Sequence, residues 1–231
     1  MLVTGFPAAV FGTNCYVLAP AAGEECVVVD PGIGVLDTLA QVLREMRLKP
    51  AAVLLTHGHI DHLFSVTPVC GAHDVPALVH ADDLYRVQDP VSTLMPELKM
   101  MLRQQYPGFT WSAPDDVRLL ADHQVVDIAG LSFTVRHAPG HTEGSVLFSV
   151  PGAPDQLQGV EVTSTALTGD VVFAGSIGRT DLPGGDPDAM TRSLRDVILP
   201  LPDDTLFLPG HGGATTMGRE RHTNPYLQIP R

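Results

Sequence analysis

Thr56-His57-Gly58-His59-Ile60-Asp61-His62 is the stretch of this sequence that indicates both a fold and a chemistry. It contains four side chains that can bind a metal ion, and it directly follows the apolar run Ala51–Leu55. A helix would point His57 and His59 in divergent directions, whereas an extended or turning backbone puts residues two apart on one side. We therefore expect the motif at the exit of a β-strand, where Gly58 permits a tight turn before a helix begins.

Three further candidate ligands follow apolar runs later in the chain, and each is directly preceded by glycine. They are His141, Asp170 and His211. Strand ends converge at one edge of a sheet, and a preceding glycine lets the backbone turn closely around an ion without a Cβ clash. We therefore expect a single site, assembled from loops at one sheet edge.

Together the candidate ligands are sufficient for two metal ions. One ion could bind His57, His59 and His141, and the other Asp61, His62 and His211, with Asp170 and a hydroxide between them. Nitrogen and oxygen ligands without thiolate suit Zn(II), and also Fe(II) or Mn(II). The pattern therefore predicts two divalent metal ions, with zinc as the first candidate.

The other histidines are expected to have different roles. His73, His80, His123 and His222 stand in polar or turn contexts without a ligand partner nearby, which favours surface or structural roles. His137 ends the strand before His141, but its spacing fits no second metal, so at most it supports the site. For Asp30, a turn and a hydrogen bond to the metal loop are both open.

The periodicity of the apolar residues predicts mostly strands, with a few helices. The expected strands are Thr13–Ala19, Cys26–Asp30, Ala51–Leu55, Pro76–Val79, Leu131–Arg136, Ser145–Val150, Thr165–Thr168 and Thr205–Leu208, and the expected helices are Val35–Arg47, Met95–Gln105 and Pro187–Leu199. Pro20–Glu25 and Pro151–Ser164 are expected to be hairpin loops. This order implies stacked sheets covered by helices, in one domain over residues 1–231.

The segment Met95–Trp111 is the densest run of bulky side chains in the sequence. Two interpretations are open for it. The segment can be a helix that contributes to the core together with its cap, or it can be a flap over a pocket, because flexible methionine and rigid aromatic side chains make adaptable binding walls.

The composition is that of a globular protein, with 44% hydrophobic and 17% charged residues and no apolar run near the ~20 residues that span a bilayer. The first basic residue is Arg44, so a secretory signal is not expected, and we predict a cytoplasmic protein without a membrane partner. Cys15, Cys26 and Cys70 are expected to be buried thiols. A net charge of -12 opposes binding to nucleic acid.

The order of these motifs resembles the metallo-β-lactamase superfamily and, within it, the glyoxalase II-like hydrolases. The resemblance covers nearly the whole chain, from H-x-H-x-D-H through His141 and Asp170 to His211. It implies an α/β fold, a four-layer αββα sandwich of two mixed sheets flanked by helices, with the metal pair where the sheets meet. It also implies the two ligand sets given above, bridged by Asp170. Enzymes that degrade antibiotics lack this bridging aspartate and are exported, so the resemblance argues against that activity.

Two further stretches bear on the substrate. Gly175–Gly185 resembles the short, bacterial glyoxalase II-like proteins, and Gly178–Asp181 within it is also similar to sulfur dioxygenases. Arg179 can clamp a substrate carboxylate or form a surface salt bridge, and both remain open. Only twenty residues follow His211, so we expect the helical domain that binds glutathione in the longer enzymes to be absent. The basic stretch Gly218–Tyr226 is expected near the mouth of the pocket.

The leading functional hypothesis is a metal-dependent hydrolase that cleaves a small-molecule thioester, such as an S-2-hydroxyacyl thiol, by a metal-bridging hydroxide. Asp170 would fix the separation of the ions and Asp61 would orient the hydroxide. The alternative is a mono-iron persulfide dioxygenase that uses His57, His59 and either Asp170 or His141. Purely structural metals and an RNA-processing nuclease are disfavoured, the first by the number of ligands and the second by the acidity of the chain. The pattern specifies neither the thiol nor the oligomeric state.

Overall fold

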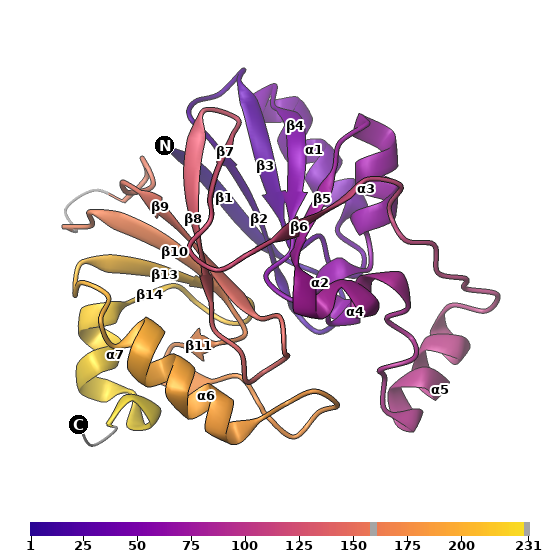
Figure 1. Cartoon of the computed structure of the whole chain (residues 1–231). Helices are drawn as coiled ribbons and strands as arrows, with labels where there is room; N and C mark the ends of the chain where they lie inside the picture. The colour runs from indigo at the N-terminus through magenta and orange to yellow at the C-terminus, as the bar shows by residue number, and fades with distance from the viewer. Residues whose placement is uncertain (158–160, 229–231) are drawn as a thin grey trace.

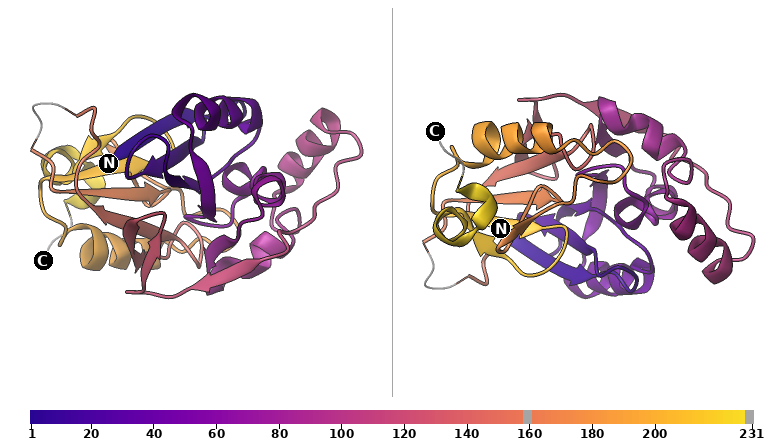
Figure 2. Two further views of the ribbon diagram at one scale, coloured as in Figure 1. Left: turned by 90° about the horizontal axis from the view of Figure 1, so that it is seen from above. Right: turned by 90° about the horizontal axis from the view of Figure 1, so that it is seen from below.

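The protein is described by a computed structural model that covers residues 1–157 and 161–228. Two six-stranded mixed sheets face one another, and helices cover their outer faces (Figure 1). Viewed along the layers, the sheets lie at the centre and the helices outside, while α5 (Pro96–Gln105) extends from one side (Figure 2).

The first sheet is built from the first half of the chain. Its strands, in spatial order, are β1 (Leu2–Pro7), β2 (Asn14–Ala19), β3 (Glu25–Val29), β4 (Lys49–Leu54), β5 (Ala77–His80) and β6 (Val117–Leu120). The pairs from β1 to β3 are antiparallel, and those from β3 to β6 are parallel. The parallel strands are connected through helices, which include α1 (Leu36–Met46) and α3 (Val66–His73).

The second sheet is built from the other half. Its strands, in spatial order, are β14 (Thr215–Thr216), β13 (Thr205–Pro209), β10 (Ser164–Gly169), β9 (Val146–Pro151), β8 (Leu131–His137) and β7 (Val125–Ile128). Only β10 and β13 are parallel, and their connection contains α6 (Pro187–Ser193), which continues as a π-helix over Leu194–Ile198. Helix α7 (Met217–Thr223) follows β14.

Alternation along the strands explains why the layers form. In β2, Val17 packs against the helices of the first half, whereas Leu18 faces the second sheet. The middle apolar layer joins Leu18 and its neighbours to residues such as Phe133 and Phe148 of the second sheet, and a third layer lies under α6 around Met190. Three apolar layers between four layers of secondary structure confirm the predicted αββα sandwich.

All eight predicted strands and the three predicted helices are present, and no bound differs by more than two residues when the π-helix that continues α6 is counted with it. The loop Pro20–Glu25 joins β2 and β3 as a hairpin, and the loop between β9 and β10 also joins an antiparallel pair, although its residues 158–160 lie outside the described residues. Elements that were not predicted include the sheet edges β1, β6 and β7 and the helices α3 and α7.

The three cysteines are buried free thiols, as predicted. Burial raises the pKa of Cys26 and of Cys70 to about 12. Among the described residues, no helix has both the length and the apolar character needed to cross a membrane.

Candidate metal centre

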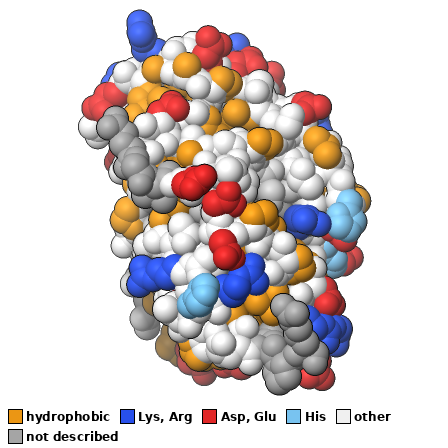
Figure 3. All heavy atoms as spheres, turned by 90° about the vertical axis from the view of Figure 1, so that its left-hand side faces the viewer, with side chains coloured by type: hydrophobic (Ala, Val, Ile, Leu, Met, Phe, Trp, Pro, Cys, Tyr) orange, Lys and Arg blue, Asp and Glu red, His pale blue; other side chains and the backbone are white. Residues whose placement is uncertain are grey.

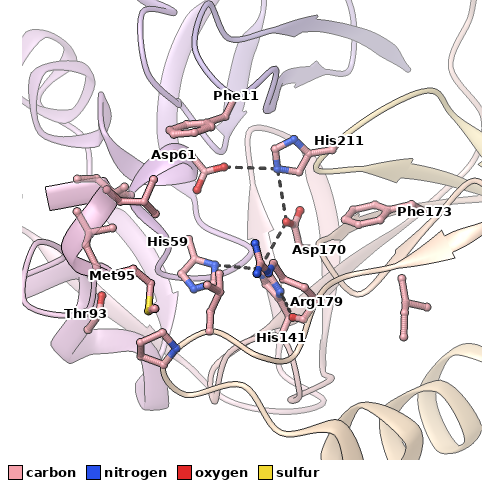
Figure 4. A pocket seen from close by; sticks show the side chains of 16 residues that line it. Phe11, His59, Asp61, Thr93, Met95, His141, Asp170, Phe173, Arg179 and His211 are labelled. Carbon is pink, nitrogen blue, oxygen red and sulfur yellow. Dashed lines mark hydrogen bonds and ion pairs between the residues drawn. The ribbon is translucent and has the colours of Figure 1, made fainter. Parts of the chain in front are cut away.

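The structure brings all seven predicted ligands together at one end of the sandwich. His57 and His59 follow β4, and Asp61 and His62 lie in the short helix α2 (Ile60–Leu63). The remaining three are on loops after strands of the second sheet: His141 after β8, Asp170 after β10 and His211 after β13 (Figure 4). Each half of the chain therefore supplies part of the site.

The first group of ligands is a trio of histidines. Nδ1 of His59 lies 3.1 Å from Nε2 of His57 and 2.9 Å from Nε2 of His141. A tetrahedral ion with nitrogen ligands at 2.0–2.1 Å would hold such atoms about 3.4 Å apart. Nδ1 of His141 is 2.7 Å from the carbonyl oxygen of Arg179, and donation of its proton there leaves Nε2 with a lone pair for an ion.

The second group consists of Asp61, His62 and His211. Oδ2 of Asp61 is 3.4 Å from Nε2 of His211 and 3.6 Å from Nε2 of His62. Donor atoms from these three side chains lie within 4.8 Å of one another, as do those of the first trio. The two groups match the two ligand sets expected from the sequence.

Asp170 lies between the two groups. Its Oδ2 is 3.5 Å from Nε2 of His141 and 3.4 Å from Nε2 of His211, while its Oδ1 is 3.4 Å from Nε2 of His62. Among the described residues, His62 Nε2 and Asp170 Oδ1 are buried polar atoms without a hydrogen-bond partner. Such atoms are costly unless something binds them, and a cation between them would do so. The residues present therefore fit a pair of divalent ions.

The electrostatics favour the protonation states that bind metal. Burial lowers the pKa of His57 and His141 and lowers that of His59 to about 3, so these rings are neutral. Burial alone would raise the pKa values of Asp61 and Asp170, but His62 and the other neighbouring histidines together outweigh it, lower both pKa values and keep the carboxylates ionised. Neutral imidazoles and ionised carboxylates are the forms that coordinate cations.

His62 and His211 have the opposite shift. Burial opposes their charge, but nearby carboxylates dominate: Asp170 and Asp61 raise the pKa of His62, and the hydrogen bond to Asp61 raises that of His211. A divalent ion bound at these nitrogens would take the place of the proton.

Asp30 makes the hydrogen bond to the metal loop that was one of its two expected roles. Its Oδ2 accepts from Nδ1 of His62 at 2.9 Å and from Oγ1 of Thr56 at 2.6 Å, and its Oδ1 accepts from the backbone N–H of Thr56 at 2.8 Å. The bond to Nδ1 leaves Nε2 of His62 directed at the site.

Asp83 is a supporting residue that the sequence analysis missed. Its Oδ2 accepts from the N–H of Gly58 at 2.6 Å and from Oγ1 of Thr142 at 2.7 Å, and its Oδ1 accepts from the N–H of Gly144 at 2.8 Å. It is fully buried and thus ties the loop of His57 and His59 to the loop of His141. The sequence places Asp83 shortly after the predicted strand Pro76–Val79, but no glycine precedes it. The pattern of a glycine followed by a ligand, which identified the other residues of the site, therefore did not identify Asp83.

The loop of His211 is held by the start of β2, which was also not foreseen. Oγ1 of Thr13 donates to Oδ2 of Asp61 at 2.8 Å, and Thr13 forms a β-bridge with His211. The N–H of Asn14 donates to the carbonyl oxygen of Gly210 at 2.7 Å. The first sheet thereby fixes a ligand loop of the second.

Two of the glycines in the ligand loops are required by close approach. A Cβ at Gly210 would meet Oδ1 of Asp170 and Cε1 of His62, and a Cβ at Gly58 would meet the side chain of Arg86. The glycine that precedes His211 therefore leaves space for the site itself.

A cavity of about 470 Å³ opens beside the ligands. Residues Thr93, Leu94, Met95 and Leu98 line it, so the start of α5 forms a wall, in agreement with the flap interpretation. The helix is also anchored by aromatic contacts, because Phe109 stacks on Phe64 with ring centroids 5.0 Å apart. Met100 on the same helix is 61% exposed and does not line the cavity.

Arg179 lies at the edge of the cavity, and its guanidinium forms a salt bridge. Its Nε and one Nη donate to the two carboxylate oxygens of Asp181, both at 2.7 Å. Its carbonyl oxygen faces Nδ1 of His141, so the backbone of Arg179 orients a predicted ligand.

His80 has two potential ligand partners nearby, so the expectation that it stands without one was wrong. Its ring stacks on His137 at a centroid distance of 3.9 Å and an interplanar angle of 13°, with Asp82 nearby. The two histidines come from different sheets, at the ends of β5 and β8, so no pattern in the local sequence indicates that their rings stack. Nε2 of His137 lies 2.8 Å from the carbonyl oxygen of Glu143.

The basic tail lies beside the wall of the cavity without lining it, because the side-chain amide of Asn224 donates to the carbonyl oxygen of Phe173, a lining residue, at 3.3 Å. Residues Gly218–Thr223 belong to α7, where Arg221 bonds to Asp203 and to two backbone carbonyl oxygens, and no tail residue lines the cavity. On the face of the molecule that carries α7, acidic and basic side chains are interspersed (Figure 3). Arg221 thus stabilises the packing of this end of the chain.

Comparisons with known proteins place this geometry in context. Residues 8–211 match the family model described as the metallo-beta-lactamase superfamily. An uncharacterized protein of Mycobacterium tuberculosis is 43% identical over 99% of this chain and 98% of its own length. The hydroxyacylglutathione hydrolase GloC of Haemophilus influenzae is 31% identical over 96% of this chain and 95% of its own.

Two solved structures are similar to this chain over nearly its whole length. The B3 metallo-beta-lactamase BLEG-1 has a TM-score of 0.80 and 34% identity, covering 99% of this chain and all of its own. The protein TTHA1623 in a di-iron-bound form has a TM-score of 0.74 and 33% identity, covering 96% of this chain and 99% of its own.

Proposed function

Because this chain belongs to the metallo-beta-lactamase superfamily, whose members bind a dinuclear metal site, we propose that it is a metal-dependent hydrolase of thioesters. The observation that carries the proposal is the position of Asp170 between the two ligand groups, within 3.5 Å of nitrogens from both. The 31% identity to a hydroxyacylglutathione hydrolase supports a thioester rather than another substrate.

The proposed reaction adds water to the thioester carbonyl carbon, breaks the C–S bond and releases a carboxylic acid and a thiol. When bound, two divalent ions would lower the pKa of a shared water toward ~7 and polarise the carbonyl. Asp61, whose Oδ2 accepts from Oγ1 of Thr13 at 2.8 Å, would accept a hydrogen bond from such a water and orient it. Arg179 and Asp30 support the orientations of His141 and His62.

Zn(II) is the proposed metal, because the donors are imidazole and carboxylate without thiolate. The same donors suit iron and manganese, and a relative in a di-iron-bound form supports testing iron beside zinc.

The decisive experiment combines metal analysis with three assays on one preparation. Two ions per chain and thiol release from S-lactoyl thioesters are the expected results. One iron per chain with oxygen uptake on a persulfide would instead establish the dioxygenase alternative. Cleavage of a chromogenic β-lactam must be included because BLEG-1 is described as a B3 metallo-beta-lactamase; preferred turnover of the β-lactam would replace the thioesterase proposal.

A further inference from the structure

The cavity beside the predicted ligands has a composition that bears on its substrate. Its volume of about 470 Å³ lies within the ~300–1,000 Å³ of small-molecule sites. Of its sixteen lining residues, five are predicted metal ligands and nine are apolar, which leaves Thr93 and Arg179. The reacting end is therefore polar, and the rest of the wall is apolar.

The apolar wall comes from segments that are far apart in the sequence. Phe11 lies near Asp61 at one side and Met95 lies near His59 at another, while the ring of Phe173 in β11 (Val172–Phe173) lies 6.1 Å from that of His211 (Figure 4). Figure 4 thus shows apolar groups on several sides of the predicted ligands. A substrate bound there would bury the groups next to its scissile bond against these side chains.

The cavity has one basic side chain among its described lining residues, Arg179, and Asp181 neutralises it. Both carboxylate oxygens of Asp181 accept from the guanidinium at 2.7 Å. The side chains of Arg179 and Asp181 are 62% and 67% exposed, so this pair lies in solvent at the edge of the cavity. A substrate carboxylate inside the cavity would lose water against the apolar wall, which costs free energy. A thiol with several charged groups, such as glutathione, is a poor match to this surface.

We propose that the thioester substrate carries an apolar, uncharged group directly beside the scissile bond, which the wall of Phe11, Met95, Leu98 and Phe173 binds. The proposal rests on the thioesterase function proposed above. The apolar group can belong to the acyl side or to the thiol side, and separate substrate series distinguish the two.

The metal-loaded protein is assayed with two series of thioesters. The first keeps the thiol N-acetylcysteamine and lengthens the acyl chain from acetyl to hexanoyl; the second keeps a lactoyl group and compares N-acetylcysteamine, 2-phenylethanethiol and glutathione. We expect kcat/KM to rise about fourfold per added methylene in the favoured series until the cavity is filled, and glutathione to be the poorest thiol.

A pair of variants tests the wall itself. Met95→Lys places a cation at a half-exposed position that lines the cavity, and Met100→Lys places one on the same helix outside it. We expect Met95→Lys to lower kcat/KM for the apolar thioesters by about tenfold and to raise it for the glutathione thioester, because the lysine supplies a free cation. Met100→Lys should leave both unchanged.

Binding of non-hydrolysable thioethers separates this proposal from the function on which it rests. If affinity measured by calorimetry rises with chain length while no thioester is cleaved, the apolar site stands and the thioesterase function fails. If glutathione thioesters are cleaved best, or if chain length changes neither affinity nor kcat/KM, the apolar substrate is wrong although hydrolysis stands.

Discussion

Asp170 is the residue through which the two ligand groups meet. Its two oxygens lie 3.4 to 3.5 Å from His62, His141 and His211, and Oδ1 is buried without a hydrogen-bond partner. Because no other carboxylate lies within 4 Å of histidines from both groups among the described residues, no neighbour can replace it.

Asp170→Asn is expected to lower the metal content from two ions per chain to one and to reduce thioester turnover by about 100-fold or more, because a neutral amide binds a shared cation poorly. Elemental analysis and thiol release measure the two effects. Asp196→Asn, at an exposed carboxylate in the π-helix that continues α6, is the control. Retention of both ions and of turnover in Asp170→Asn would contradict the bridging role.

Asp83 is a second residue on which the site depends, although it is not one of the predicted metal ligands. It is buried and receives hydrogen bonds from two ligand loops, so Asp83→Asn puts an amide N–H against donors that need an acceptor. We expect the free energy of unfolding to fall by about 2–3 kcal/mol and metal affinity to fall by about 10–100-fold. Urea titration and competition with a chelator test this. Asp82→Asn, the exposed neighbour, should change neither, and an equal effect there would refute the assignment.

Among the elements of the fold, helix α5 buries little of its own surface and is held mainly by aromatic residues that follow its C-terminal end. Leu102 is its one buried residue, while Phe64 packs on Tyr106 and Phe109 beyond its end and Trp111 donates to the carbonyl oxygen of Val87 at 2.8 Å. The helix therefore depends on an aromatic cluster at its C-terminal side. Its N-terminal side remains free to form the cavity wall.

Phe109→Ala is expected to loosen this wall, because an aromatic pair contributes ~0.5–1.5 kcal/mol beyond its buried area. Hydrogen exchange of the amides in residues 96–105 should become faster, and KM for an apolar thioester should rise about fivefold with little change in kcat. Tyr226→Ala, at an exposed aromatic away from α5, is the matched control. Unchanged exchange in α5 would show that other contacts hold it.

The elements also show what the sequence can and cannot predict. Buried strands such as β4 and β13 end in apolar runs, and the ligands after their ends were predictable because a strand followed by a turn has a local signature. The edge strand β7 exposes alternate residues, the edge strand β6 exposes two consecutive residues, and neither is a continuous buried run. The contacts of Asp83 and the stacking of His80 on His137 depend on which loops meet across the sheets, and local patterns do not contain that information.

At the scale of the whole molecule, the predicted metal site lies between the two halves of the chain, each of which forms one sheet. Residues 57–62 follow β4 of the first sheet, whereas His141, Asp170 and His211 follow strands of the second, so bound ions would link the two halves at one end. The apolar layer around Leu54, Phe133 and Phe148 joins the same sheets without any ion. The fold should therefore persist without metal, at reduced stability.

Removal of metal by a chelator is expected to lower Tm by about 5–10 °C, because ions present at 100 times their Kd stabilise by ~2.7 kcal/mol and 1 kcal/mol corresponds to ~2–4 °C for a chain of this size. Far-ultraviolet circular dichroism should not change, since the apolar layers remain. Adding Zn(II) back should restore Tm in the unmodified protein, but only partly in Asp170→Asn. Loss of secondary structure on chelation would mean that the ions, rather than the layer between the sheets, hold the halves together, and an unchanged Tm would mean that these seven side chains bind no ion tightly.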